Sequence, residues 1–274
     1  MGLRIATNVA SIAAQRVLGK QQSRAEHAAQ ALASGSRIVN ASDDAAGLAI
    51  SENFKAQLRG IAQARNNANN AISFAQVGEG GLSEVTNILT RMRELGVQAA
   101  SDTISDTERG LLNTEAKQLL QEADRIVKTT SFGNAKLLDG SGGKLEFHVG
   151  AYGGEDNVIA FDFDADATVS ALGVDGLSVE DKSSAKDALS QVDEAMLKVG
   201  ALRANFGAIQ SRLETTVNSL DTSYENLAAS NSRIRDADIA KETAELASSN
   251  ILQNTAVSVL AQANQLPNVA LKLI

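Results

Sequence analysis

Residues 246–274, which read LASSNILQNTAVSVLAQANQLPNVALKLI, form the stretch that decides the fold. No charged residue occurs between Glu245 and Lys272, although the whole chain carries a net charge of −8. Apolar side chains lie nearly all round a helix of this sequence, so most of its surface must be buried against other helices. Its many Ser, Thr, Asn and Gln side chains argue against a membrane span. Two series repeat every seven residues: Leu252, Val259, Leu266 and Leu273, and Ala256, Ala263 and Ala270.

The composition favours closely spaced helices over a thick globular core. Hydrophobic residues make up 43% of the 274 residues, but aromatic residues make up only 3%, and the one proline is Pro267. An acidic chain lacks the basic surface that phosphate binding needs, so we expect no nucleic-acid partner. The absence of cysteine excludes disulfides, thiolate zinc sites and cysteine nucleophiles. The N-terminus lacks the unbroken apolar segment of a secretory signal, and we expect no membrane insertion.

A long helix is predicted over residues 3–33, where glycine occurs once and proline is absent. Residues 34–36 (SGS) end this helix with turn chemistry. Its apolar side chains change from one face to another, which predicts burial on more than one side, as in residues 246–274. The two stripes are Ile5, Val9 and Ile12, and then Leu18, Ala25 and Leu32.

Two further helices carry long heptad repeats of the coiled-coil type. Asp43 and Asp44 precede the first, at the helix end where acidic side chains are favourable. A glycine cluster at residues 78–81 is its predicted weak point, since each glycine costs about 1 kcal/mol relative to alanine. The first repeat comprises Ile50, Phe54, Ile61, Ala64, Ala68, Ala71, Ala75, Leu82, Val85, Leu89, Met92 and Ala99. The second comprises Ala188, Val192, Ala195, Val199, Leu202, Phe206, Ile209, Leu213, Leu220 and Leu227.

A shorter helix is predicted between the two long ones. Ser105 and Glu108 have the spacing of a capping box, which marks the start of a helix. Its inward-facing residues are expected to be Leu112, Ala116, Leu119, Ala123 and Ile126.

The middle of the chain changes from helical to strand-like periodicity. Residues 145–149 and 158–163 alternate apolar and polar side chains on either side of a glycine-rich loop, which predicts a β-hairpin. Because this region reverses the chain between the long helices, the economical arrangement pairs those helices antiparallel and brings the two termini together. The sequence therefore predicts a mainly α fold. It is an elongated antiparallel coiled coil or helical bundle formed from both chain ends, with a small β-hairpin region in the middle.

No catalytic or metal-binding grouping emerges from the sequence. His27 and His148 are the only histidines, and nothing in the sequence places zinc ligands or triad partners near either one. Asp162, Asp164 and Asp166 have the spacing of a calcium loop, but the glycine and glutamate that such a loop requires are missing. We therefore expect no enzyme activity, no metal and no cofactor.

Several stretches resemble bacterial flagellin. Residues 32–38 (LASGSRI) and 43–50 (DDAAGLAI) resemble the N-terminal signature of that family. Residues 232–238 (SRIRDAD) and 258–265 (SVLAQANQ) resemble its C-terminal signature, and residues 91–95 (RMREL) resemble its long-helix motif. Ordered matches at both ends make the resemblance specific.

The resemblance implies a structural subunit that self-assembles into the bacterial flagellar filament used for swimming. It also implies secretion through the flagellar type III system to the extracellular filament. The implied partners are copies of the chain itself, an export chaperone, and the cap and hook-junction proteins. The alternatives are a hook–filament junction protein of the same superfamily and a type III-secreted coiled-coil adaptor.

On the same resemblance the chain divides into three parts. Residues 1–42 with 231–274 are expected to form the paired terminal helices of an inner tube. Residues 43–139 with 181–230 are expected to form an outer helical bundle, and residues 140–180 the small hairpin region. The residues expected to drive self-assembly are Ile5, Val9, Ile12, Leu18, Leu32, Leu252, Val259, Leu266, Val269 and Leu273.

Three residues match positions that the flagellin-sensing Toll-like receptor of animals reads in this family. They are Arg91, Leu95 and Glu115. Contact with a host receptor through these side chains is therefore a further expectation from the resemblance.

Overall fold

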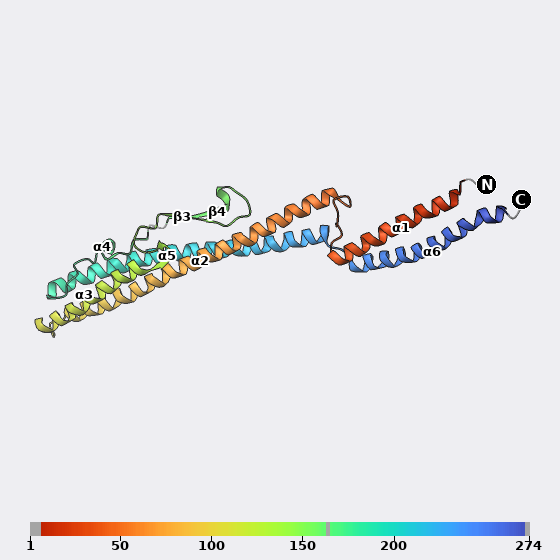
Figure 1. Ribbon diagram of the computed structural model, residues 1–274. Helices are drawn as coiled ribbons and strands as arrows, with labels where there is room; N and C mark the ends of the chain where they lie inside the picture. The colour runs from red at the N-terminus through yellow and green to blue at the C-terminus, as the bar shows by residue number, and fades with distance from the viewer. Residues whose placement is uncertain (1–6, 163–164, 272–274) are drawn as a thin grey trace. The chain divides into compact units, whose positions relative to one another are not determined.

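The computed structural model of the chain describes residues 7–162 and 165–271, with the backbone alone at residues 162 and 266–271 (Figure 1). The chain divides into two compact units, Met1–Ala56 with Glu225–Ile274 and Gln57–Tyr224. The helices are α1 (Val9–Ser34), α2 (Ala45–Ala99), α3 (Asp106–Thr129), α4 (Val169–Leu172), α5 (Lys182–Arg235) and α6 (Ile239–Leu271). The strands are β1 (Ser131–Phe132), β2 (Ala135–Lys136), β3 (Lys144–His148) and β4 (Val158–Asp162), and a 3₁₀ turn η1 covers Glu155–Asn157.

In the first unit, α1 and α6 lie side by side and antiparallel (Figure 1). The Asn8 side-chain amide donates to the carbonyl of Ala263 at 2.8 Å. At the other end of the pair, the Arg37 N–H donates to the carbonyl of Arg235 at 2.7 Å. Helix α1 ends at Gly35, whose φ of 64° lies in the left-handed region that glycine adopts readily. The predicted pairing of the two chain ends is confirmed.

In the second unit, the heptad stripes of α2 and α5 face each other in an antiparallel pair. Arg65 contacts Asp221 at 3.0 Å, and Arg93 contacts Asp193 at 2.7 Å, so later residues of α2 lie beside earlier residues of α5. The buried positions follow the predicted repeats. The predicted residues that are buried are Ile61, Ala64, Ala68, Ala71, Ala75, Leu82, Val85, Leu89, Met92 and Ala99 on α2, and Ala188, Val192, Ala195, Val199, Phe206, Ile209 and Leu213 on α5. The helices also bury Phe74, Leu95 and Ala185, which the predicted repeats did not include.

The repeats do not bury every predicted residue. Ile50 is 47% exposed, whereas its neighbour Ser51 is buried. Leu220 and Leu227 are only half-buried. The physical reason is that a third helix covers only part of the pair. Helix α3 packs beside the C-terminal part of α2, where Arg91 contacts Glu115 of α3. A stripe that faces a single helix keeps part of its side chains in water.

The glycine cluster of α2 is a close-packing feature rather than a break in the helix. Helix α2 is continuous through it, and the cost of each glycine in helix propensity stays a prediction. A Cβ atom at Gly78 would lie 2.8 Å from two ring atoms of Phe206, and one at Gly81 would lie 2.7 Å from Cδ1 of Leu138. Phe206 and Leu138 are fully buried, so each glycine makes room for a core side chain.

Helix α3 begins as predicted. The Ser105 side chain accepts from the Glu108 N–H while the Glu108 carboxylate accepts from the Ser105 N–H, which is a complete capping box. The buried Arg109 then donates to the carbonyls of Ala99 and Ser101, both at 2.9 Å. One arginine thereby satisfies carbonyls that the end of α2 leaves without helical partners.

The predicted hairpin is β3 paired antiparallel with β4, with Phe147 opposite Ile159. Phe74 of α2 makes edge-to-face contacts with Phe132 and Phe147 at ring-centroid distances of 5.7 and 5.9 Å. The aromatic residues, scarce elsewhere, therefore hold the β elements against the helices. Sequence analysis missed the short β1–β2 pair and α4; the signal available for the first was Gly133, which has a φ of 61° in its turn.

We predict opposite effects for two alanine substitutions in this glycine cluster. Gly80 has open space around it, so Gly80→Ala should raise the free energy of unfolding by about 0.5–1 kcal/mol through helix propensity. Gly78→Ala shares that gain but crowds Phe206, so it should be less stable than Gly80→Ala by about 1–3 kcal/mol. Guanidinium denaturation followed by circular dichroism measures both. Equal stability of the two variants would contradict the packing argument.

Candidate assembly surface

The contact between α1 and α6 is made of small side chains. Both helices bury a heptad-spaced stripe against each other, and among the residues whose side chains the structure describes, no Leu, Ile, Val or Phe is fully buried in that stripe. Small residues allow close approach of two helices but bury little apolar area. The buried residues are Ser11, Ala14, Gln21, Ala28 and Ala31 on α1, and Ser249, Ala256 and Ala263 on α6. We call this stripe the alanine seam.

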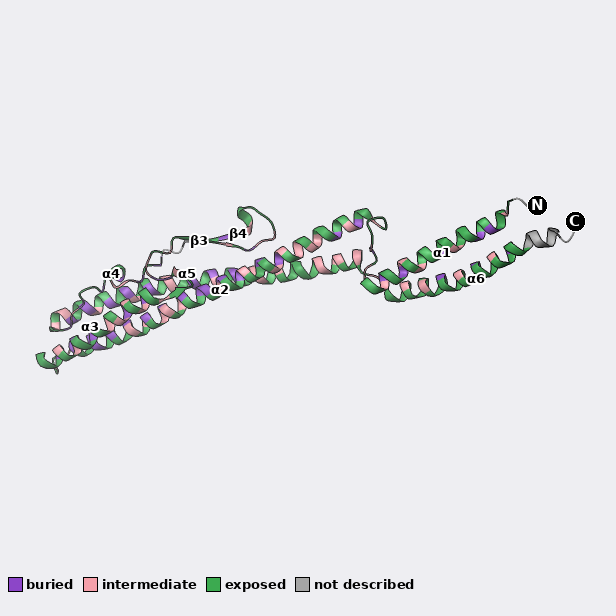
Figure 2. Ribbon diagram, in the orientation of Figure 1, coloured by how far each residue is buried: buried purple, intermediate pink, exposed green. Residues whose placement is uncertain are grey.

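The large aliphatic side chains of the same two helices lie on their outer faces. Figure 2 shows α1 and α6 mostly exposed, with only a few buried positions along each. In residues 9–17 and 251–259, seven of these side chains are each between 46% and 66% exposed; Ile239, the first residue of α6, is 55% exposed as well. Exposed apolar side chains gathered on one pair of helices mark an interaction surface. The seven are Val9, Ile12 and Val17 on α1, and Ile251, Leu252, Val257 and Val259 on α6, and together we call them the outer aliphatic face.

Four of the residues predicted for self-assembly belong to the outer aliphatic face: Val9, Ile12, Leu252 and Val259. Leu18 and Leu32 are half-buried. Ile5 and Leu273 lie outside the described residues, and at Leu266 and Val269 only the backbone is described. The prediction did not include Val17, Ile251 and Val257, the other three residues of the outer aliphatic face. A role in assembly remains a prediction for all of these residues.

The three residues matched to a host receptor lie together on α2 and α3 but differ in exposure. The guanidinium of Arg91 donates to Glu115 Oε1 at 2.9 and 2.8 Å and to Glu94 Oε2 at 2.9 Å. Glu115, followed by Glu94, raises the pKa of Arg91 above its usual value. Leu95 is 0% exposed, within the core beside α5. A partner could touch Arg91 and Glu115, but Leu95 can only support that surface from beneath.

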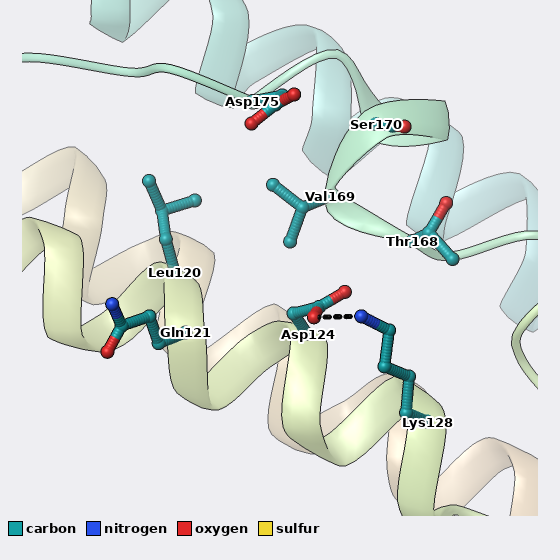
Figure 3. Close-up of a pocket in the computed structure, with 8 residues that line it drawn as sticks. All are labelled: Leu120, Gln121, Asp124, Lys128, Thr168, Val169, Ser170 and Asp175. Carbon is teal, nitrogen blue, oxygen red and sulfur yellow. Dashed lines mark hydrogen bonds and ion pairs between the residues drawn. The ribbon is translucent and has the colours of Figure 1, made fainter.

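A shallow hollow of about 440 Å³ lies between α3 and the segment around α4 (Figure 3). Its ionisable side chains are Asp124, Lys128 and Asp175, and Asp124 accepts a hydrogen bond from Lys128 at 2.5 Å. The residues that line it include no histidine and show no pairing of a nucleophile with a general base. Within residues 7–162 and 165–271, no group of three His, Asp or Glu side chains could hold a metal ion. Among the described helices, none is long and apolar enough to cross a membrane.

The segment between α1 and α2 is organised by one carboxylate. Asp43 Oδ2 accepts from the N–H of Asn40 at 2.8 Å and from that of Val39 at 3.1 Å. His27 Nε2 of α1 lies 3.1 Å from the same oxygen. The Asn40 hydrogen bond, with help from His27 and Val39, holds the pKa of Asp43 below its usual value against the opposing effect of burial. The turn and α1 are thereby joined through one side chain.

Comparison with known proteins agrees with this architecture. The bacterial flagellin N-terminal helical region matches residues 5–142, and the bacterial flagellin C-terminal helical region matches residues 189–274. A flagellin of Halalkalibacterium halodurans is 42% identical over 97% of this chain and 98% of its own length. The flagellar filament core protein flaB2 of Brachyspira hyodysenteriae is 39% identical over 98% of this chain and 99% of its own.

Among solved structures, the crystal structure of Bacillus cereus flagellin matches with a TM-score of 0.51 and 27% identity. That match covers 61% of this chain and 94% of the other. The long helices, the paired ends and the two matched regions define a helical filament-type protein. The chain belongs to the bacterial flagellin family. The resemblance seen in the sequence is confirmed.

We predict that the turn organised by Asp43 opens in acid. Because the pKa of Asp43 is lowered in the folded chain, its stabilising effect is present above the unfolded value of about 3.9 and is lost as the pH falls through the lower folded value. Hydrogen exchange should show protection of the Val39 and Asn40 amides at pH 6 that is lost only as the pH falls below the unfolded value of about 3.9. Asp43→Asn should abolish this pH dependence. An equal loss of protection in the variant would contradict the assignment to Asp43.

Proposed function

We propose that this chain is the structural subunit of a bacterial flagellar filament, and that it assembles with copies of itself through the outer aliphatic face of α1 and α6. The observation that carries the proposal is that the small and the large apolar side chains of these helices lie in different places. Alanine fills the contact within one chain, while seven large aliphatic side chains stay exposed. Membership of the flagellin family supplies the class of assembly.

The energetics favour a polymer with many contacts over a simple pair. Fully burying one Leu, Ile or Val contributes about 1.5–3 kcal/mol, so completing the burial of seven half-exposed side chains is worth roughly 6–11 kcal/mol per subunit. Association costs an estimated 4–15 kcal/mol in lost freedom of motion. The two terms are similar in size, so a subunit that touches several neighbours is held far better than one with a single neighbour.

The same outer face argues against one of the two alternatives. A secreted coiled-coil adaptor has no need for exposed apolar side chains on both terminal helices. A junction protein of the same superfamily would share the apolar terminal helices. However, the relatives with 39–42% identity over almost the whole chain are named flagellin and flagellar filament core protein. These observations favour the filament subunit, within a family of structural proteins.

The route of secretion, the role in motility and the protein partners belong to the same proposal. We infer secretion through the flagellar type III system to an extracellular filament that serves motility. An export chaperone and the cap and hook-junction proteins are the corresponding partners. The basis is family membership, to which the exposed terminal helices add a physical reason for a chaperone, since unassembled chains would otherwise associate through them.

Contact with an animal flagellin receptor is proposed through Arg91 and Glu115. Both side chains are exposed and lie on adjacent helices, joined by two hydrogen bonds. Leu95 is not part of this contact surface, because it is fully buried.

The first prediction concerns assembly. Leu252→Gln with Val259→Gln should raise the critical concentration for polymerisation at least about tenfold, because the two half-exposed side chains together lose burial worth about 1.4–3 kcal/mol, and 1.4 kcal/mol is a tenfold change. Seeded polymerisation followed by sedimentation and electron microscopy measures it.

The matched control for this assembly test is Thr255→Gln with Ser258→Gln, which replaces exposed polar residues of the same helix. It should polymerise like the parent chain. Normal tubes from the double variant, or equal failure of the control, would refute assembly through this face. The helical content of each variant, read by circular dichroism, separates loss of assembly from loss of fold.

The second prediction concerns the receptor. Arg91→Ala should weaken binding of the unassembled chain to the receptor ectodomain at least about tenfold, as expected for loss of an interfacial charge that anchors a contact. Surface plasmon resonance measures it. Arg65→Ala, at another exposed ion pair of α2, is the control and should bind normally. Unchanged affinity in the Arg91 variant would remove the proposed contact.

A further inference from the structure

The alanine seam contains a polar layer that the outer face does not explain. Gln21 is 9% exposed and Ser249 is 1% exposed, so both are buried between α1 and α6. Gln21 Oε1 and Ser249 Oγ have no hydrogen-bond partner among the residues that the structure describes. Burying such groups costs free energy that alanine would not cost. Their presence in the seam therefore calls for a role other than stability.

The two side chains occupy the same level of the helix pair. The register is given at one end by the hydrogen bond from Asn8 to Ala263 and at the other by that from Arg37 to Arg235. Counting inward along two antiparallel helices from either contact places Gln21 within one turn of Ser249. At this level a rotation of the side chain would let the Ser249 hydroxyl donate to Gln21 Oε1, and a single bridging water could donate to both oxygens.

Both residues interrupt an otherwise uniform alanine repeat. Gln21 is the middle member of a seven-residue series whose other members are Ala14 and Ala28. Ser249 is the first member of the series that continues with Ala256 and Ala263. With alanine at both sites, these two alanine repeats by themselves would not distinguish the native pairing from one slid by seven residues.

A slip of seven residues separates the two polar groups. It would bring Ser249 level with Ala14 or Ala28, and Gln21 level with Ala256 or Glu242. Each buried oxygen would then face a methyl group or a carboxylate instead of sharing one polar layer. Slipped pairing thus carries a penalty that the native register avoids. Polar residues at single seam positions of coiled coils fix register in this way, at a cost in stability.

We propose that Gln21 and Ser249 set the register in which α1 pairs with α6, and so position the outer aliphatic face for assembly. A slip by one heptad would move half of that face by about 10 Å relative to the other half. The inference extends the proposed function by naming positioning residues for it. Pairing register can nevertheless be measured whether or not the chain polymerises.

The test uses engineered disulfides, for which the cysteine-free chain is suited. Ser11 Oγ lies 2.9 Å from Asn264 Oδ1, so Ser11→Cys with Asn264→Cys reports the native register. Ser11→Cys with Val257→Cys, one heptad away, reports the slipped register. After mild oxidation, mass spectrometry of the sedimented and soluble fractions gives the ratio of slipped to native intrachain disulfides. Links between chains run as dimers and are counted separately.

Each reporter pair is combined with substitutions in the polar layer and with matched controls. Gln21→Ala with Ser249→Ala should raise the slipped-to-native ratio at least about tenfold, which corresponds to 1.4 kcal/mol. Gln15→Ala with Ser248→Ala changes the same residue types at exposed positions of the same helices and should leave the ratio unchanged. The exchange Gln21→Ser with Ser249→Gln keeps a shared polar layer and should preserve the native register.

Three results from the substituted variants would overturn the inference. They are an unchanged ratio in the double alanine variant, an equal rise in the exposed control, and slippage in the exchange variant as large as in the alanine variant. Absence of the native disulfide from the parent reporter in both fractions would overturn it as well. Failure of the parent chain to polymerise would instead refute the proposed function. The inference about register would still be tested, because the soluble fraction also gives the ratio of slipped to native disulfides.

Discussion

The alanine contact between α1 and α6 is the constraint on which the rest of this chain depends. Helices of 26 and 33 residues pair through methyl groups and a few polar side chains. Each buried methyl contributes only about 0.8 kcal/mol, far less than a buried leucine. The pair is therefore close but weakly stabilised by itself, and its large apolar side chains remain available. That surplus of exposed apolar surface is the basis of the proposed assembly through α1 and α6.

The second unit uses the same periodicity for the opposite purpose. On α2 and α5 the heptad positions carry Leu82, Leu89, Phe206 and Leu213, and these side chains are buried within one chain. Helix α3 and the hairpin cover the pair further, and glycine at position 78 lets the helices close over Phe206. This unit gains its stability internally. The contrast between a leucine core and an alanine seam separates a self-sufficient part of the chain from a part that assembly completes.

Electrostatics contributes orientation more than stability. The ion pairs Arg65–Asp221 and Arg93–Asp193 join the long helices at their exposed edges, where such pairs are worth about 0–1 kcal/mol each. They favour one antiparallel alignment of α2 with α5, as the buried polar layer does for α1 with α6. The net charge of −8 opposes association of identical chains over long distances, and salt screens that repulsion. Apolar burial must therefore supply the attraction.

The sequence by itself determined the helical class, the capping box at Ser105, the hairpin and the pairing of the two ends. Each of these follows from local periodicity or from the spacing of caps and turns, which a single chain segment carries in full. It also determined the family, through the ordered signatures at both termini. Sequence periodicity could not decide which of two seven-residue series in α6 faces α1. The leucine and alanine series are equally regular, and only packing against α1 shows that Ala256 lies inside and Leu252 outside.

Other features were decided by the tertiary structure for the same reason. The heptad of α2 places Leu95 near the edge of its stripe, and only the third helix and α5 together bury it completely. From the sequence, glycine at positions 78 and 81 could be assigned only a cost in helix propensity, whereas the structure shows that it makes room for Phe206 and Leu138. Gln21 and Ser249 looked like ordinary polar residues until the antiparallel register brought them to one level. Periodicity fixes the direction of a side chain on its own helix, but what covers that side chain depends on a second segment distant in the sequence.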